Sequence, residues 1–577
     1  MNTIHLQFED AAQQFNIGKL DEAERISKHI YELDPDNQDA AHLLAIICYK
    51  NGAFINALSF VDAALNILIN PQFLNTKGNI FVALGECDLA ESSYRDAISI
   101  GPKTIDSYNN LSILLRKLNK TNEAILVCKK GLTVDSYHVG ILNTLGLCYY
   151  DFRQFELAVR YFQKVILIAP NFIMAHLNLA RSYYSQGNIN DAIAYLSQLQ
   201  KNYPNNYQIY LSLADVYRDE KNYHEAILAY RNVLEGEQKN FDANNNLGIC
   251  LLSIGKIKEA IACFYKALDI NSDDPTIITN LCICFSSLQN YSLIIELLKK
   301  FKPRAEDFDL HQIYIYSAIG YWLSGDKERV RNYLDLSRSR LKSDSLNKSA
   351  RFSNAYYAYL NTLCDKIDLH KMCDLEKMYF VGDSHTLVHN QQILNIKNQA
   401  FYCEAKLVLG CKIWHLIESQ YNRFKYALNC ALESLPRNSN LVFNIGEIDC
   451  RKDEGIILQI KNEKANIAEI CEDMALRYVN EITEIACAKQ FVIFLMGIPA
   501  PVIELEGELS NDQLLQINIV RHINEALKGN CKNRKDITFV DIYSITTDNT
   551  GKANPGFHLD DFHVSQTSCQ LAFDQVI

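Results

Sequence analysis

Two patterns of apolar and polar positions divide the chain. Over roughly the first 345 residues, apolar positions recur at helical spacing and small residues return about every 34 positions. After about residue 375, short apolar runs alternate with amphipathic stretches. These patterns predict a helical solenoid over 1–345, a linker or helical connection over 346–374, and an α/β domain over 375–577.

The helical repeat carries one small residue in each of two helices. In the first helix these are Ala11, Ala45, Gly78, Ser112, Gly146, Ala180, Ala214, Gly248 and Cys282. Twelve positions later follow Ala23, Ala57, Ala90, Ala124, Ala158, Ala192, Ala226 and Ala260, and Ile294 breaks the series. Antiparallel helices approach closely where side chains are small, and stacked hairpins then bury a continuous core with a concave inner surface.

This pattern resembles the tetratricopeptide repeat family, with eight clear repeats over roughly residues 5–275. A weaker ninth repeat follows, and a helix pair centred on Gly325 and Val330 closes the array. The resemblance implies a groove for a protein or peptide. Residues two positions before the small residue of the first helix would line it: Asn110, Asn178, Asn246 and Asn280. These amides either grip the backbone of an extended peptide or fill solvated polar positions.

The second pattern predicts a doubly wound parallel sheet with helices on both faces. Candidate strands span 377–381, 405–409, 441–445, 491–496 and 537–542, and the amphipathic stretches include 413–432 and 467–486. Ligands of such sheets bind beyond the carboxyl ends of the strands. Residues that directly follow each run are therefore the candidates for chemistry.

Polar residues follow the first and the last run. Ser384, in Gly-Asp-Ser-His, would expose its hydroxyl at the sheet edge, or it caps a helix. Asp560 and His563 are three positions apart, so one turn can place the carboxylate on the imidazole Nδ1 and leave Nε2 as a base. A surface turn is the alternative. Asp561 is a second candidate for the carboxylate, and His558 for the base.

Two further motifs follow the second and third runs. Gly410 either admits a ligand close to the backbone or makes a turn. The third run ends in Asn444-Ile445-Gly446-Glu447-Ile448-Asp449-Cys450-Arg451, which puts two carboxylates and a guanidinium at the same edge.

The order of these motifs resembles the SGNH, or GDSL-like, hydrolase family. The resemblance implies a three-layer flavodoxin-like fold and acyl transfer, usually ester hydrolysis. It assigns Ser384 as nucleophile, His563 as general base and Asp560 as its orienting partner, and it implies oxyanion donors at the N–H groups of Ser384 and Gly410. Gly446 opens the third motif of the family.

Ile448 departs from that family, because it stands where an asparagine normally donates to the oxyanion. Losing one such donor typically lowers the rate about 100–1,000-fold. Asn444 or Arg451 would replace it. In the alternative interpretation, Arg451 pairs with Glu447 or Asp449 and only braces the loop.

The composition of the chain argues against several classes of binding partner. The 577 residues include 57 Lys and Arg against 68 Asp and Glu, a net charge of −11 without a basic run, which argues against nucleic acid. The longest apolar run is too short to span a bilayer, and 18 cysteines without a secretory start favour the cytoplasm. His385 and His389 have the spacing of metal ligands, but no matching carboxylate motif follows, so we expect exposed or helix-capping histidines and no metal or cofactor.

Together these features predict an esterase or O-acyltransferase guided by its repeats. The substrates would be acyl esters of a carbohydrate, or of a glycosylated or protein partner, and the carbohydrate class rests on family resemblance alone. The alternative is a non-catalytic interaction scaffold with a degenerate hydrolase-like domain.

Overall fold

The computed structural model describes residues 2–300, 310–338, 348–451, 466–503, 509–548, 550–560 and 563–576. The chain forms two compact units, Met1–Val216 and Tyr217–Ile577. The first unit is helical, and the second combines helices with a six-stranded sheet. None of the helices in the described ranges is long and apolar enough to cross a bilayer.

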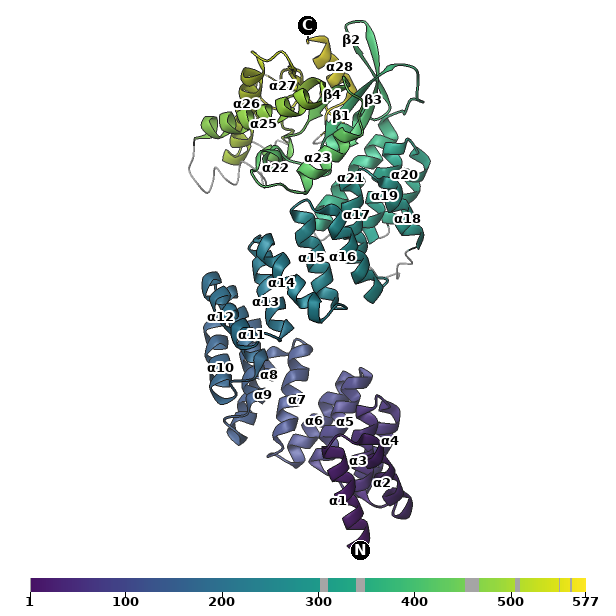
Figure 1. Cartoon of the computed structure of the whole chain (residues 1–577), viewed down its shortest axis with the longest axis vertical. Coiled ribbons are helices and arrows are strands. Elements are labelled where there is room, and N and C mark those ends of the chain that lie inside the picture. Colours follow the sequence, from purple (N-terminus) through teal and green to yellow (C-terminus); the bar gives the residue numbers. More distant parts are fainter. Residues whose placement is uncertain are drawn as a thin grey trace. The chain divides into compact units, whose positions relative to one another are not determined.

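Consecutive helices pair along the N-terminal part of the chain (Figure 1), which confirms the predicted helical solenoid. Eight pairs are α1 (Asn2–Asn16) with α2 (Leu20–Leu33), α3 (Gln38–Lys50) with α4 (Phe54–Ile67), α5 (Pro71–Leu84) with α6 (Cys87–Ile100), α7 (Ile105–Lys117) with α8 (Thr121–Val134), α9 (Val139–Asp151) with α10 (Phe155–Ile168), α11 (Ile173–Ser185) with α12 (Ile189–Asn202), α15 (Phe241–Ser253) with α16 (Ile257–Ile270), and α17 (Pro275–Ser287) with α18 (Tyr291–Lys300). The boundary between the two units lies within α13 (Tyr207–Asp219), and α14 (Tyr223–Gly236) belongs to the second unit. The helices α19 (Leu310–Ser324), α20 (Lys327–Arg338) and α21 (Lys348–Lys366) follow.

The small residues of the first helices make room for aromatic rings of the second. A Cβ atom added to Gly78 would lie 2.5 Å from the Tyr94 ring, and one added to Gly146 would lie 2.6 Å from Phe162. Both rings are fully or almost fully buried. The repeat therefore depends on a missing side chain in one helix and a large one in its partner.

The sheet has the order β2-β3-β1-β4-β5-β6. Its strands are β1 (Glu376–Gly382), β2 (Gln392–Ile396), β3 (Gln399–Leu407), β4 (Asn440–Asn444), β5 (Val492–Met496) and β6 (Ile537–Val540). The helices of this domain are α22 (Ile413–Ile417), α23 (Arg423–Glu433), α25 (Ile467–Lys489), α26 (Asn511–Cys531), α27 (Ile542–Thr546) and α28 (Gln566–Asp574), with 3₁₀ turns η1 (Ser384–His389), η2 (Ile448–Cys450) and η3 (Pro555–Phe557). Five strands are parallel, and their spatial order 2-1-3-4-5 is one of the two common doubly wound orders.

Alternate residues of the strands pack into hydrophobic cores on opposite faces of the sheet. The domain therefore has three layers, with helices on each face of the central sheet. Met378 and Phe380 of β1 pack with Phe573 of α28, whereas Tyr379 and Val381 pack with Tyr478 of α25. The sheet is thus covered on both faces, as predicted.

Two predictions about this domain are wrong in detail. The sheet is mixed, because β2 pairs antiparallel with β3 through a turn in which Lys397 and Asn398 both have positive φ, the geometry of a tight hairpin. The stretch 413–432 is two helices, because the Asn422 side chain accepts from the N–H groups of Phe424 and Lys425 and starts α23 afresh.

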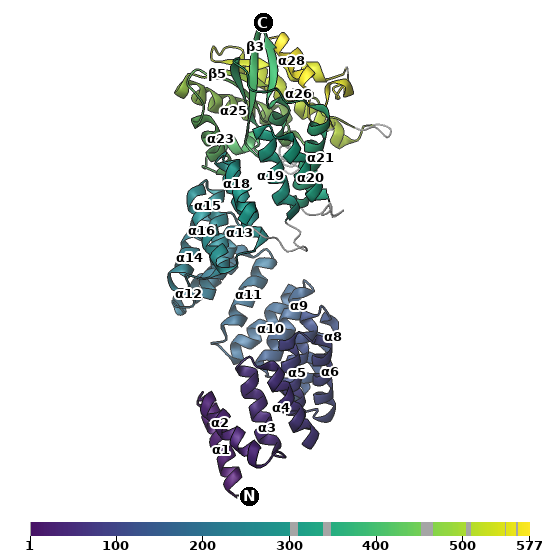
Figure 2. The same cartoon turned by 90° about the vertical axis from the view of Figure 1, so that its right-hand side faces the viewer.

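Within the second unit, the last helices pack against the sheet domain (Figure 2). Trp322 of α19 is fully buried, and its indole N–H donates to the Leu387 carbonyl at 2.9 Å. The Asn390 amide donates back to the Trp322 carbonyl at 2.8 Å. Leu387 belongs to η1, so these bonds fix the turn that carries Ser384.

Candidate active site

The three predicted catalytic side chains meet in the structure. The Ser384 Oγ lies 3.0 Å from the His563 Nε2, and the His563 Nδ1 lies 2.9 Å from each oxygen of the Asp560 carboxylate. An ionised carboxylate only accepts, so Nδ1 carries the proton and Nε2 is left to accept from the hydroxyl. Asp560 also accepts from the His563 backbone N–H at 2.7 Å, which fixes the loop as well as the ring. Asp561 lies outside the described residues.

His563 is buried beside an aromatic ring. Its exposed fraction is 6%, and the Tyr359 ring of α21 stacks on the imidazole with centroids 3.5 Å apart. Burial lowers the pKa of His563 below the usual histidine value, although the Asp560 hydrogen bond opposes this. The imidazole is therefore neutral near pH 7, as a general base requires.

The turn that presents Ser384 needs a glycine before it. A Cβ on Gly382 would lie 2.0 Å from the Asn444 carbonyl oxygen of the neighbouring strand β4. Asp383 then caps η1 by accepting from the His385 backbone N–H at 3.0 Å. Ser384 is thus the first residue of a short 3₁₀ helix, and Asp383 takes the capping role.

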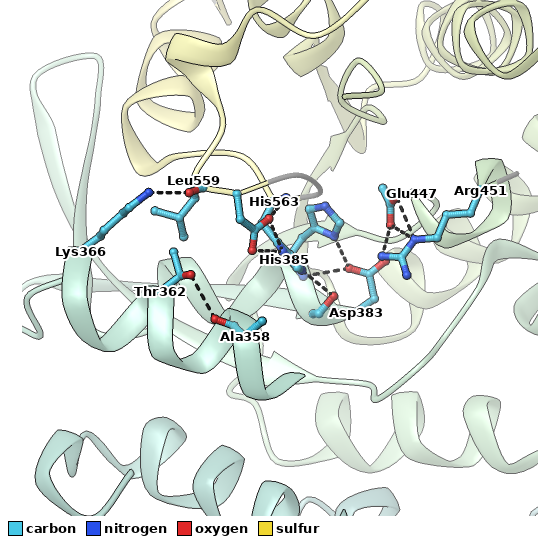
Figure 3. A network of polar contacts seen from close by, with 11 residues as sticks. Ala358, Thr362, Lys366, Asp383, His385, Glu447, Arg451, Leu559 and His563 are labelled. Atoms are coloured by element: carbon cyan, nitrogen blue, oxygen red, sulfur yellow. Dashed lines mark hydrogen bonds and ion pairs between the residues drawn. The ribbon is translucent and has the colours of Figure 1, made fainter. Parts of the chain in front are cut away.

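Asp383 and His385 form a second buried pair beside His563 (Figure 3). The His385 Nδ1 lies 2.9 Å from Asp383 Oδ1, and its ring centroid is 4.7 Å from that of His563. Burial opposes ionisation of Asp383, but the His385 charge and hydrogen bonds hold its pKa below the usual value. His389 is also buried, against Phe380, and burial lowers its pKa to about 3.

The expectation that His385 and His389 are exposed or cap a helix is therefore wrong. Both face the interior because η1 is packed between the sheet and α19. In the described part of the chain, no three His, Cys, Asp or Glu side chains gather as metal ligands would.

Asn444 provides an unpaired donor at the carboxyl end of β4. Its side chain is 5% exposed, and its Nδ2 has no hydrogen-bond partner among the described residues. Arg451, the other candidate, pairs with Glu447 through contacts of 2.6–3.0 Å (Figure 3). The bracing interpretation of Arg451 is thus the one that the geometry favours, and Asn444 is left with a donor to offer.

The two glycine motifs are held together by Asp449. Its carboxylate accepts from the Ile413 N–H at 2.7 Å and from the Trp414 N–H at 3.4 Å, which ties η2 to the start of α22, three residues after Gly410. Burial raises the pKa of Asp449 to about 7. Gly446 has φ 139°, and a Cβ there would lie 2.9 Å from Ile413 and from Ile498.

His558, the second candidate for the base, contacts a different group. His558 Nδ1 lies 3.4 Å from the Asn554 carbonyl, and the contact with Ser384 comes from His563. Sequence reasoning missed Tyr356 and Tyr359, which come from α21: Tyr356 hydrogen-bonds Ser384, and Tyr359 covers the imidazole. The aromatic run in residues 352–359 was the available signal.

The side chains of the predicted asparagine ladder bond to other asparagines of the array. The Nδ2 groups of Asn110, Asn178 and Asn280 donate to an asparagine of the preceding repeat at 3.2, 3.1 and 3.2 Å, respectively. Asn246 accepts from Asn245 at 3.3 Å. The amides of Asn110, Asn178 and Asn280 therefore link neighbouring repeats, and a role in gripping a peptide stays a prediction.

Comparison with known proteins concerns the repeats. Residues 104–134, 143–207, 177–235 and 241–274 match models described as tetratricopeptide repeat. The matched segments within residues 104–274 are thus tetratricopeptide repeats. Similar curated proteins include Protein FlbA of Caulobacter vibrioides, 27% identical over 31% of this chain and 30% of its own length, and DnaJ homolog subfamily C member 7 of Homo sapiens, 27% identical over 28% and 38%. The chain thus spans about a third of the length of these relatives.

A solved tetratricopeptide repeat protein from Parabacteroides merdae is also similar. The two chains are 20% identical over 49% of this chain and 98% of the other, with a TM-score of 0.35.

Proposed function

We propose that this protein is a repeat scaffold whose C-terminal domain is a serine esterase or acyltransferase of the SGNH type. The observation that carries the enzymatic part is the 3.0 Å separation of Ser384 Oγ and His563 Nε2, with the Asp560 carboxylate 2.9 Å behind the imidazole. This is the hydrogen-bonded relay that activates a serine. Acyl esters of carbohydrates, or of a glycosylated or protein partner, are the proposed substrates.

The chemistry follows from these positions. The Ser384 hydroxyl gives its proton to His563 Nε2 while Oγ attacks the ester carbonyl carbon. The resulting oxyanion accepts from the N–H groups of Ser384 and Gly410 and from the Asn444 amide. His563 then protonates the leaving alcohol, and water or an acceptor hydroxyl releases the acyl group and regenerates Ser384.

The matched family models support the interaction role more directly than the hydrolase role. They lie within residues 104–274, in the repeats, and Ile448 lacks the donor that the hydrolase resemblance calls for. A scaffold with an inactive C-terminal domain is therefore the second candidate. In both cases the repeats bind a protein or peptide.

A fluorophosphonate probe separates the two candidates without knowledge of the natural ester. Activated serine displaces fluoride from the probe and forms an Oγ–phosphorus bond. We expect a label on the Ser384 peptide and hydrolysis of 4-nitrophenyl acetate, both lost in Ser384→Ala. Ser544→Ala, which removes an exposed hydroxyl from the same domain, is the matched control. A wild-type protein with neither label nor hydrolysis overturns the enzymatic proposal and leaves the scaffold.

A further inference from the structure

A cavity of about 190 Å³ lies in the second unit between the last repeats and the sheet domain. Helices α17, α19, α21 and α23 and the loop after β3 contribute its lining. Most of the lining is apolar or neutral, and Arg423 is the single charged residue among the described residues that form it. A cavity of about 150 Å³ admits benzene, so this one holds a group of similar or slightly larger size.

Arg423 lacks an anionic partner in the part of the chain that the structure describes. Its largest electrostatic neighbours are Tyr316, Cys284 and Cys411. Burial raises the pKa of all three, so they are neutral near pH 7. Burial also lowers the pKa of Arg423, although the guanidinium stays protonated.

The position of Arg423 makes its charge more costly. It is the first residue of α23, where the helix dipole disfavours a cation. Two lining hydroxyls are already used as donors, since Ser286 donates to the Cys282 carbonyl and Ser287 to that of Ile283. Arg423 is partly buried. A partly buried cation without a counterion loses hydration, and a bound anion offsets that cost.

Two lining residues, Gly410 and Phe352, relate the cavity to the proposed catalytic residues. Gly410, whose N–H is a proposed oxyanion donor, is part of the lining. Phe352 also lines the cavity, and its ring centroid lies 4.7 Å from that of Tyr356, which hydrogen-bonds Ser384. An ester whose carbonyl oxygen accepts from the Gly410 N–H would therefore extend along the cavity that Arg423 also lines.

We propose that Arg423 binds the carboxylate of an acidic ester and selects substrates with one carboxylate a few bonds from the scissile group. This rests on the proposed esterase activity. A planar guanidinium pairs with a carboxylate through two parallel hydrogen bonds. One guanidinium matches one negative charge, whereas a phosphate dianion would leave a second charge without a partner.

Binding is tested apart from catalysis in full-length Ser384→Ala protein. Titration calorimetry compares monomethyl glutarate, which keeps one carboxylate, with dimethyl glutarate, which has none. We expect at least tenfold tighter binding of the monoacid, and loss of that preference when Arg423→Gln is added. Equal binding of both esters, or a preference that survives Arg423→Gln, overturns the inference. Inorganic phosphate that displaces the monoacid more strongly than acetate does overturns the assignment to a carboxylate.

Selectivity is tested in the active protein with mono-4-nitrophenyl glutarate and 4-nitrophenyl valerate. The ratio of their kcat/KM values falls at least tenfold in Arg423→Gln, and Arg423→Lys restores part of it. Arg437→Gln, at an exposed arginine after α23, keeps the wild-type ratio. No hydrolysis of either ester, with the calorimetric preference intact, disproves the esterase proposal but supports the anion site. Hydrolysis without any preference for the acid disproves the anion site alone.

Discussion

The imidazole of His563 has a carboxylate on one side, a hydroxyl on the other and a tyrosine ring across its face. The carboxylate favours the protonated ring, whereas burial disfavours it, and burial is the larger effect. The side chain is therefore held as a neutral base. A solvent-exposed histidine at this position would be partly protonated near neutral pH.

We expect kcat/KM to decrease at acidic pH with an apparent pKa below 6.5. Only neutral His563 accepts the Ser384 proton, and a lowered pKa keeps it neutral as the pH drops through the usual histidine value of 6.5. Hydrolysis of 4-nitrophenyl acetate between pH 4 and 8 gives the apparent pKa. An apparent pKa at or above 6.5 contradicts this, and His558→Gln should leave the apparent pKa unchanged.

Asn444→Ala should lower kcat about 100–1,000-fold with little change in KM. The amide nitrogen is buried and unpaired in the described structure, so it meets a new acceptor only when the oxyanion forms. Steady-state kinetics with 4-nitrophenyl acetate measure both constants. Asn429→Ala, at an exposed asparagine of α23, is the control. A loss of less than fivefold would remove Asn444 from the mechanism.

Among the helices and strands, those whose formation depends on nearby residues can be predicted from the sequence. The repeat helices follow from small residues such as Gly78 and Gly146, because a close helix contact leaves no alternative side chain. Strands β1, β4 and β5 are recognisable because most of their residues are apolar and buried. The order of motifs after the predicted strands also predicted that Ser384 and His563 lie close together, and the two side chains are in hydrogen-bond contact.

Other elements depend on contacts that no local pattern shows. The β2–β3 hairpin turns at Lys397-Asn398, which lacks the usual glycine. Tyr356 and Tyr359 look like ordinary core residues of a connecting helix, and only tertiary packing puts them on Ser384 and His563. Arg423 likewise falls inside the predicted stretch 413–432, where no local pattern marks it, although it lines a cavity.

The bends between paired helices give a stability prediction. Arg153 occupies the position that Gly18, Gly52 and Gly187 occupy in other repeats, and it has φ 58°. A non-glycine residue in this conformation destabilises the folded state by roughly 1–2 kcal/mol, and glycine removes that strain. Glycine also gives the unfolded chain more conformational freedom, which offsets part of the stabilisation. Arg153→Gly should therefore raise the free energy of unfolding by roughly 0.5–1 kcal/mol, measured by urea denaturation.

Arg160→Gly is the matched control for this substitution. Arg160 is exposed in the second turn of α10, in the same repeat. Glycine inside a helix is destabilising by about 1 kcal/mol. The two variants should shift the urea midpoint in opposite directions. A decrease of similar size in both would show that the bend gains nothing from glycine.

On the scale of the whole molecule, the proposed enzyme and the last repeats share one core within the second unit. A single cluster joins Trp322, Tyr359 and Leu363 of the helices to Leu387 and Leu407 of the sheet domain. Polar contacts cross the same boundary, including Gln289 to the Leu407 carbonyl and Lys366 to the Leu559 carbonyl, both at 2.8 Å. Removing the helices would therefore expose the apolar edge that carries the site.

Because of this shared core, the helical and sheet parts of the second unit should unfold in one transition. Buried cysteines report both parts in one sample: Cys284 and Cys364 in the helices, Cys403 and Cys569 in the sheet domain. Pulsed alkylation across a urea series, read by mass spectrometry, should give four coincident midpoints. Trp322→Ala removes a fully buried side chain at a cost of roughly 3–5 kcal/mol and should lower all four together. Helical cysteines that react at lower urea than Cys403 and Cys569 would show that the two parts are energetically separate.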